Sequence, residues 1–154
     1  YKGIGSAKAI TILAACELGK RRQKATVEEA PILNSAENIY QFMHTTIQDL
    51  DIEEGWVLMM KQNFRLIEAK RISVGGLTMA PVDLRLMMKE VLLKNTTVLA
   101  FCHNHPSGST NPSRDDDILT SHIHKACDLL HIHFADHVIL TDGGYFSYRE
   151  EGKL

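Results

Sequence analysis

The sequence predicts an α/β fold in which a mixed β-sheet is flanked by helices. Two short apolar runs rich in β-branched, aromatic or large aliphatic residues, Trp56–Met60 and Thr97–Cys102, are typical of buried strands. Segments whose apolar residues recur at helical spacing lie around them, and the chain has no internal repeat. Because strands and helices alternate along the chain, we expect one central sheet with helices packed on it.

Length, charge and cysteine content limit the functional classes. A chain of 154 residues with 44% hydrophobic content suits one sizeable domain and a small appendage. The formal net charge of -2 identifies neither a nucleic-acid nor a membrane partner. The three cysteines form neither a disulfide framework nor a Cys-x-x-Cys pair, and no apolar stretch approaches the roughly 20 residues that span a bilayer. We therefore expect a cytoplasmic protein without a membrane partner.

The chain begins with a short amphipathic element and a linker. Apolar residues at helical spacing predict a helix from Ser6 to Leu18, and Gly19 followed by three cations marks its end. The polar stretch after it contains Pro31 and is interpreted as a linker over residues 25–33. The main domain is then expected over residues 34–154.

The main domain should open with a helix and a hairpin. Asn34 or Ser35 is a suitable N-cap for a helix that presents an apolar stripe from Ile39 to Leu50. The strand Trp56–Met60 and a second strand-like run, Arg65–Ile72, flank a polar turn, which predicts a hairpin.

A third helix should follow the hairpin. Pro81 stands where a first helical position would be, and the apolar stripe runs from Leu84 to Leu92. The buried strand Thr97–Cys102 comes next and brings His103 to its end.

The last part of the chain should close the sheet. Pro112 and Ser113 start a helix that continues to Leu130. Beyond it, strand-like residues from Ile132 to Leu140 and from Tyr145 to Tyr148 surround a Gly-Gly turn.

Two histidines at the end of a buried strand suggest a metal site. His103 and His105 are two residues apart, so their imidazoles project from the same face of the strand. Asp116 follows in the first turn of the predicted helix, after a loop rich in Ser, Gly, Asn and Pro that is able to fold back. Two neutral imidazoles and one carboxylate leave a fourth tetrahedral position for water, the arrangement of a catalytic zinc site rather than a structural one.

The stretch from His103 to Asp116 resembles the JAMM (MPN-plus) motif, His-x-His-Pro-x6-Ser-x-x-Asp. The His-Asn-His-Pro-Ser-Gly wording and the later pairs Asp136-His137 and Asp142-Gly143 more closely resemble the RadC family, over about Ser35 to Leu154. This resemblance implies a three-layer, cytidine-deaminase-like architecture and one Zn²⁺ per chain. It also implies a metallopeptidase that hydrolyses peptide or isopeptide bonds in a peptide or protein substrate.

The same resemblance implies two catalytic residues. Ser113 would hydrogen-bond the developing oxyanion or position water, although Ser-x-x-Asp before an apolar run is also close to a helix capping box. A carboxylate that is not a ligand would shuttle the proton, and Glu53, just ahead of Trp56–Met60, occupies the matching place. Glu54 is the alternative, since a register error of one residue moves a side chain to the other face of a strand.

Other histidines and one cysteine are not expected to be metal ligands. His131, His133 and His137 are expected to be structural, or to support the ligands through Asp136 or His137. His122 and His124 do not share a helix face, so we expect them at the surface. Cys102 should point to the side of the strand opposite His103, into the core.

Residues 1–24 resemble the remnant of a helix-hairpin-helix segment. In that element, backbone N–H groups of a Gly-x-Gly turn such as Lys2–Gly5 contact a DNA phosphate. An alternative function is therefore a DNA-repair-associated accessory protein with a structural or vestigial metal site. A nucleotide deaminase is disfavoured, because the chain lacks the His-x-Glu and Pro-Cys-x-x-Cys elements of that chemistry. Substrate identity and oligomeric state stay open.

Overall fold

A computed structural model describes residues 5, 8, 10–18, 30–48, 50–75 and 82–154. Contacts divide the chain into two units, Tyr1–Ala30 and Pro31–Leu154. In the first unit, residues 10–18 are helical, within the range predicted. Several residues of the predicted N-terminal features lie outside the described residues. They are residues 2–4 of the proposed turn, the three cations Lys20, Arg21 and Arg22, and most of the linker. Among the described residues, no helix is both long and apolar enough to cross a membrane.

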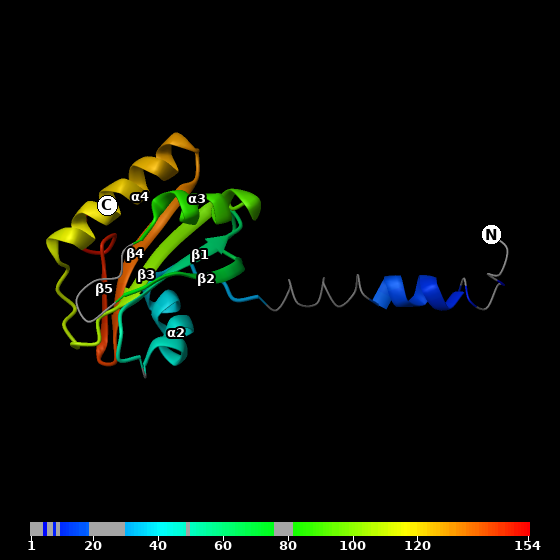
Figure 1. The fold of residues 1–154 in the computed structure, drawn as a ribbon, viewed down its shortest axis with the longest axis horizontal. Coiled ribbons are helices and arrows are strands. Elements are labelled where there is room, and N and C mark those ends of the chain that lie inside the picture. Colours follow the sequence, from blue (N-terminus) through cyan, green and yellow to red (C-terminus); the bar gives the residue numbers. More distant parts are fainter. Residues whose placement is uncertain (1–4, 6–7, 9, 19–29, 49, 76–81) are drawn as a thin grey trace. The chain divides into compact units, whose positions relative to one another are not determined.

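The second unit is built on a five-stranded mixed sheet in the order β2-β1-β3-β4-β5. β3 and β4 run parallel, whereas the other neighbouring pairs are antiparallel. The strands are β1 (Glu54–Met60), β2 (Leu66–Val74), β3 (Val98–Asn104), β4 (His133–Thr141) and β5 (Gly144–Ser147). The helices of this unit are α2 (Ala36–Ile47), α3 (Leu84–Leu93) and α4 (Arg114–Leu129). Because α2 covers one face of the sheet and α3 and α4 cover the other (Figure 1), the expected α/β fold with helices on both faces is confirmed.

Two hydrophobic cores lie on the two faces of the sheet. Successive side chains of a strand alternate between faces, so Ala100 and Cys102 of β3 belong to the core under α2, whereas Leu99 and Phe101 belong to the core under α3 and α4. Cys102 is fully buried on the side predicted for it. The same alternation places His103, the next residue, on the face that α4 covers.

Among the element boundaries that differ from the prediction, three concern α2, α3 and β3. The α2 helix ends at Ile47, so Leu50 packs against the core from the segment beyond it. The α3 helix begins at Leu84, capped by the carboxylate of Asp83, so the prediction that Pro81 opens this helix was wrong. Pro81 itself lies outside the described residues.

The third difference concerns β3, which continues through Asn104 instead of ending before His103. The Asn104 side chain explains the extension, because its Oδ1 accepts from the backbone N–H of Glu54 at 2.7 Å and its Nδ2 donates to the Ile52 carbonyl at 2.9 Å. His103 is therefore held by strand pairing on both sides, opposite Gly55 of β1 and Ile139 of β4.

A β-bulge in β4 sets which of its side chains face α4. Phe134 pairs with Leu99 and Asp136 pairs with Ala100, which leaves Ala135 as an extra residue. The extra residue reverses the alternation, so that His137 faces α4 together with Phe134. Without the bulge, Asp136 would occupy that face.

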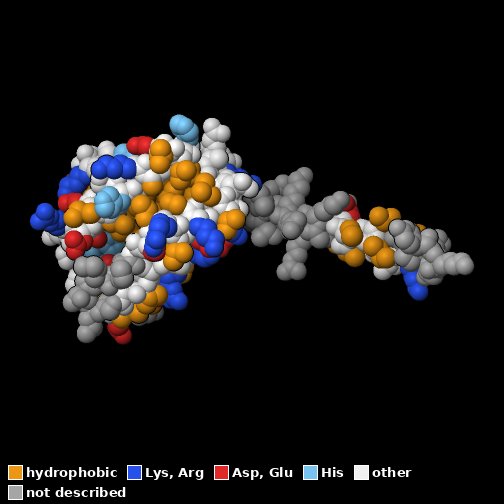
Figure 2. Space-filling view, turned by 45° about the horizontal axis from the view of Figure 1, so that its top comes forward, with side chains coloured by type: hydrophobic (Ala, Val, Ile, Leu, Met, Phe, Trp, Pro, Cys, Tyr) orange, Lys and Arg blue, Asp and Glu red, His pale blue; other side chains and the backbone are white. Residues whose placement is uncertain are grey.

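Charges of both signs are interspersed on the surface of the second unit, around a broad group of hydrophobic side chains (Figure 2). The exposed hydrophobic residues include Leu86, Leu92 and Leu93 of α3. The face that Figure 2 presents carries no extended patch of one charge, in keeping with the net charge of -2.

Candidate metal centre

Four side chains predicted from the sequence converge at one end of the sheet. One possible ligand atom from each of Glu53, His103, His105 and Asp116 lies within 4.8 Å of every other. His103 Nε2 is 3.0 Å from His105 Nε2, 3.2 Å from Asp116 Oδ1 and 3.9 Å from Glu53 Oε1. His105 Nε2 is 3.7 Å from Asp116 Oδ2. The structure thus brings the three predicted ligands and the predicted proton shuttle into one cluster.

Each predicted ligand lies at or next to the end of a regular element. His103 belongs to β3. His105 is the first residue after this strand, and its backbone N–H donates to the Leu140 carbonyl at 2.9 Å. Asp116 is the third residue of α4, in its first turn. Ends of rigid elements hold side chains more firmly than free loops do.

The loop after β3 fixes the orientation of the His105 ring. Gly108 adopts a φ of 77°, a left-handed conformation suited to glycine, and its N–H donates to the His105 carbonyl at 3.0 Å. The turn brings the Ser109 carbonyl to 2.7 Å from His105 Nδ1. A carbonyl only accepts hydrogen bonds, so Nδ1 of His105 carries the proton and Nε2 presents a lone pair to the cluster.

The donor set fits a divalent cation such as zinc. Burial opposes ionisation of Asp116, but contact with His103 and hydrogen bonds from Ser113 outweigh it and hold the pKa of this carboxyl well below its usual range. Two imidazole nitrogens and a carboxylate are the ligands of catalytic zinc sites, and the cluster matches that set.

The two candidate glutamates lie on opposite faces of the sheet. Glu53 lies in the cluster, with its side chain 24% exposed. Glu54 is buried, accepts from Trp56 Nε1 at 3.2 Å and forms an ion pair with Arg71 at 2.5 Å. Glu54 is therefore a structural residue in this fold, and its alternative assignment as a proton shuttle receives no support from its position.

Gly55, next to these glutamates, is a position of close approach. It pairs with His103 across β1 and β3. A Cβ atom at this position would overlap Ser73 Oγ and lie 2.9 Å from Phe101 Cζ. Only glycine lets β1 and its neighbours pack this tightly beside the cluster.

The contacts of Ser113 are those of a helix cap. Its Oγ accepts from the Asp116 N–H at 3.1 Å and donates to Asp116 Oδ2 at 2.7 Å, while its own N–H donates to the same oxygen at 2.7 Å. These bonds form a capping box that also holds the carboxylate of a predicted ligand. The oxyanion role of Ser113 stays a prediction.

His137 is the site residue that the sequence indicated only weakly. It is fully buried, and its Nε2 lies 2.9 Å from His103 Nδ1. Burial lowers the pKa of His137 well below its ordinary value, so its ring is neutral. Its place beside a ligand depends on the bulge at Ala135, which the sequence pattern did not reveal. His122 is exposed and His124 is partly exposed, in agreement with the surface positions expected for them.

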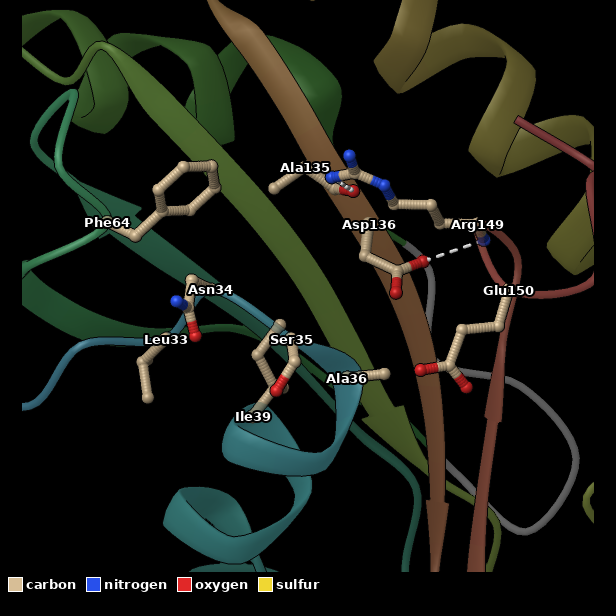
Figure 3. Close-up of a pocket in the computed structure, with 10 residues that line it drawn as sticks. All are labelled: Leu33, Asn34, Ser35, Ala36, Ile39, Phe64, Ala135, Asp136, Arg149 and Glu150. Carbon is tan, nitrogen blue, oxygen red and sulfur yellow. Dashed lines mark hydrogen bonds between the residues drawn. The ribbon is translucent and has the colours of Figure 1, made fainter.

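Two hollows lie near the sheet without containing the whole cluster. One, of about 490 Å³, borders the candidate metal centre and is lined by His105, Pro106 and residues of the segment after α2. Another, of about 390 Å³, lies between the start of α2, β4 and the C-terminal segment, and its ten lining residues are shown in Figure 3. None of the four cluster residues lines this second hollow.

Comparison with known proteins finds a matching family model and several similar proteins. The family model of the RadC-like JAB domain matches residues 33–153. A UPF0758 protein of Flavobacterium johnsoniae is 38% identical over 152 residues, which are 99% of this chain and 66% of that protein. A UPF0758 protein of Porphyromonas gingivalis is 35% identical over 155 residues, covering 100% of this chain and 68% of its own length. The chain thus spans about two thirds of the length of these relatives.

Proposed function

This chain belongs to the RadC-like JAB domain family, and from that premise we propose that it is a zinc-dependent hydrolase of peptide or isopeptide bonds. The proposal rests on one observation above all. A carboxylate that is not needed as a ligand, Glu53, lies 3.9 Å from a ligand nitrogen and remains partly open to solvent. Such an acid beside a cation site is what hydrolysis of an amide requires.

Each cluster residue has a part in this reaction. His103, His105 and Asp116 would hold the ion. Zinc bound there would supply a Lewis acid that polarises the scissile carbonyl and makes water a better nucleophile at neutral pH. Glu53 would take a proton from the attacking water and deliver it to the leaving amine.

Ser113 would act on the same reaction through its position at the start of α4. Its hydroxyl is engaged with Asp116, so its first contribution would be to hold that ligand. A second contribution, a hydrogen bond to the developing oxyanion, would require the hydroxyl to leave Asp116 during the reaction. The substrate is proposed at the level of class, a peptide or protein amide.

Replacing Glu53 by glutamine tests the proposal. The variant Glu53→Gln should keep one zinc ion per chain but lower the turnover of a peptide and isopeptide library by about 10²-fold or more, because the amide cannot move the proton. Glu68→Gln makes the same change on β2, where Glu68 pairs with Lys94, and should leave both properties unchanged. Zinc content is measured by atomic absorption and turnover by mass spectrometry.

Two outcomes would contradict the hydrolase proposal. One is full turnover by Glu53→Gln. The other is a zinc-loaded protein that cleaves no member of the library, a result that favours an accessory role with a structural metal site.

A further inference from the structure

A continuous chain of hydrogen bonds runs from α4 through β4 to one predicted ligand. The Thr120 hydroxyl lies 2.6 Å from the Asp116 carbonyl and 2.6 Å from His137 Nδ1. The other ring nitrogen of His137, Nε2, lies 2.9 Å from Nδ1 of His103. Thr120, His137 and His103 are 3%, 0% and 2% exposed, so protein groups rather than bulk water decide where the protons lie.

The direction of every bond in this chain follows from its first acceptor. A carbonyl cannot donate, so the single hydroxyl proton of Thr120 goes to Asp116. The Thr120 oxygen must then accept from His137 Nδ1, and the other ring nitrogen, Nε2, is the acceptor that faces His103. His103 consequently donates from Nδ1, and its Nε2 is left bare.

The bare nitrogen of His103 is the one directed at the cluster. His103 Nε2 lies 3.2 Å from Asp116 Oδ1 and 3.0 Å from His105 Nε2. Aromatic packing holds the middle of the chain in place, because the Tyr148 ring stacks on His137 with centroids 4.8 Å apart and planes 5° from parallel. The Phe101 ring packs against His137 in a T-shaped arrangement, with ring centroids 5.0 Å apart.

We propose that Thr120 and His137 are positioning residues that hold His103 in its Nδ1–H tautomer and so reserve its Nε2 for the metal ion. The metal part of this inference rests on the proposed function. The two predicted ligand histidines are oriented by different groups. The Ser109 carbonyl orients His105, whereas the side chains of His137 and Thr120 orient His103. Hydrogen-bond partners of a ligating histidine set its orientation and basicity.

A single substitution distinguishes the relay from simple packing. Thr120→Val keeps the shape of the side chain but removes the acceptor for His137 Nδ1–H. The reversed arrangement, in which His137 donates from Nε2 and His103 carries its proton on Nε2, then becomes accessible and blocks the ligand atom. Thr120→Ser keeps the hydroxyl and should restore the original direction.

The experiment measures zinc affinity by competition with a chromogenic chelator, and the protonated ring nitrogens by long-range ¹H–¹⁵N NMR of the metal-free full chain. Wild type and Thr120→Ser should show His103 protonated on Nδ1. Thr120→Val should bind zinc about 10- to 100-fold more weakly and shift His103 toward protonation on Nε2. Thr96→Val is the control, since Thr96 is buried, has an unpartnered hydroxyl and lies just before the opposite end of β3. Its zinc affinity should equal that of wild type.

Three results would overturn the inference. They are a folded Thr120→Val protein with wild-type zinc affinity, an unchanged His103 tautomer in that variant, or a wild-type His103 that carries its proton on Nε2. The third result is measured on wild type, so it does not depend on the folding of any variant. If wild type binds no zinc, the proposed function fails, while the tautomers of the metal-free protein still decide whether the relay exists.

Discussion

Asp136 is a buried acid outside the cluster whose hydrogen bonds join β4 to the chain after β5. Its carboxylate is 4% exposed and accepts from Ser147 Oγ at 2.5 Å and from the Arg149 N–H at 3.0 Å. These bonds tie β4 to the chain that follows β5, at the wall of the hollow in Figure 3. Burial raises the pKa of Asp136 by more than the hydrogen bonds from Ser147 and Arg149 lower it.

The raised pKa predicts a pH dependence of stability specific to this residue. A folded-state pKa above the unfolded value of 3.8 means that the ionised carboxylate opposes folding at neutral pH. As the pH falls through the folded-state pKa, the carboxyl takes up a proton and this destabilising charge disappears. The free energy of unfolding of wild type relative to Asp136→Asn should therefore rise between pH 7 and about pH 4, as measured by urea denaturation. A difference that falls or stays constant with acidification would contradict the assignment.

At the scale of single residues, spacing predicted the residues of the cluster but not the residues that orient them. His103, His105 and Asp116 stand at intervals that strand and helix geometry convert directly into proximity. The choice between Glu53 and Glu54 depended on strand register, which the antiparallel pairing of β1 and β3 supplies. His137 depended on a bulge, and a bulge leaves no mark in a hydrophobic pattern.

The start of α4 has two roles, capping of the helix and placement of a cluster residue. Its capping box satisfies backbone N–H groups of the first turn, and the acid that completes the box is also a cluster carboxylate. Helix stability and ligand placement are thus coupled through Ser113 and Asp116. Disturbing the cap should affect both.

Substitution of Ser113 separates capping from an oxyanion role. Ser113→Ala should lower the free energy of unfolding by about 1 kcal/mol, and it should weaken zinc binding because Asp116 Oδ2 loses the Ser113 hydroxyl as a hydrogen-bond donor. Ser113→Asn keeps a capping oxygen and should restore most of the stability. A role limited to the oxyanion would instead lower turnover in both variants and leave stability and zinc affinity unchanged. Thermal unfolding, chelator competition and peptide turnover supply the three readouts.

At the scale of elements, periodicity predicted which segments are helices and strands but set some boundaries wrongly. Apolar stripes located α2, α3 and α4 because these helices bury one face against the sheet. The start of α3 was misplaced because the carboxylate of Asp83 satisfies the first N–H groups of the helix. The end of β3 was misplaced because the Asn104 side chain bonds the start of β1, a contact between residues fifty positions apart.

The whole molecule assembles its candidate site from segments distant in sequence. Glu53 just precedes β1, the histidines end β3 and Asp116 opens α4, and the order β2-β1-β3-β4-β5 places β1 and β3 side by side. Strand order of this kind could not be derived from periodicity, since it is decided by pairing between remote segments. The family resemblance of the motif supplied the expectation of a three-layer fold, which local patterns alone left open.

The division into two units predicts that the site is independent of the N-terminal residues. Every residue of the cluster, and both cores, belong to Pro31–Leu154. The backbone of Pro31 and Leu33 pairs with Leu66 and Phe64 at the start of β2, so a cut within residues 1–30 spares this contact. Removal of residues 1–29 should therefore leave zinc affinity and the urea unfolding midpoint of the second unit unchanged.

The same truncation tests the expected DNA contact of residues 1–24. If those residues bind phosphates, the full chain should bind duplex DNA with an affinity that falls as salt rises, and the truncated chain should lose that binding. Fluorescence anisotropy across a salt series measures both proteins. Equal DNA binding by the two would place the contact in the second unit, and weaker zinc binding after truncation would show that the units are energetically coupled.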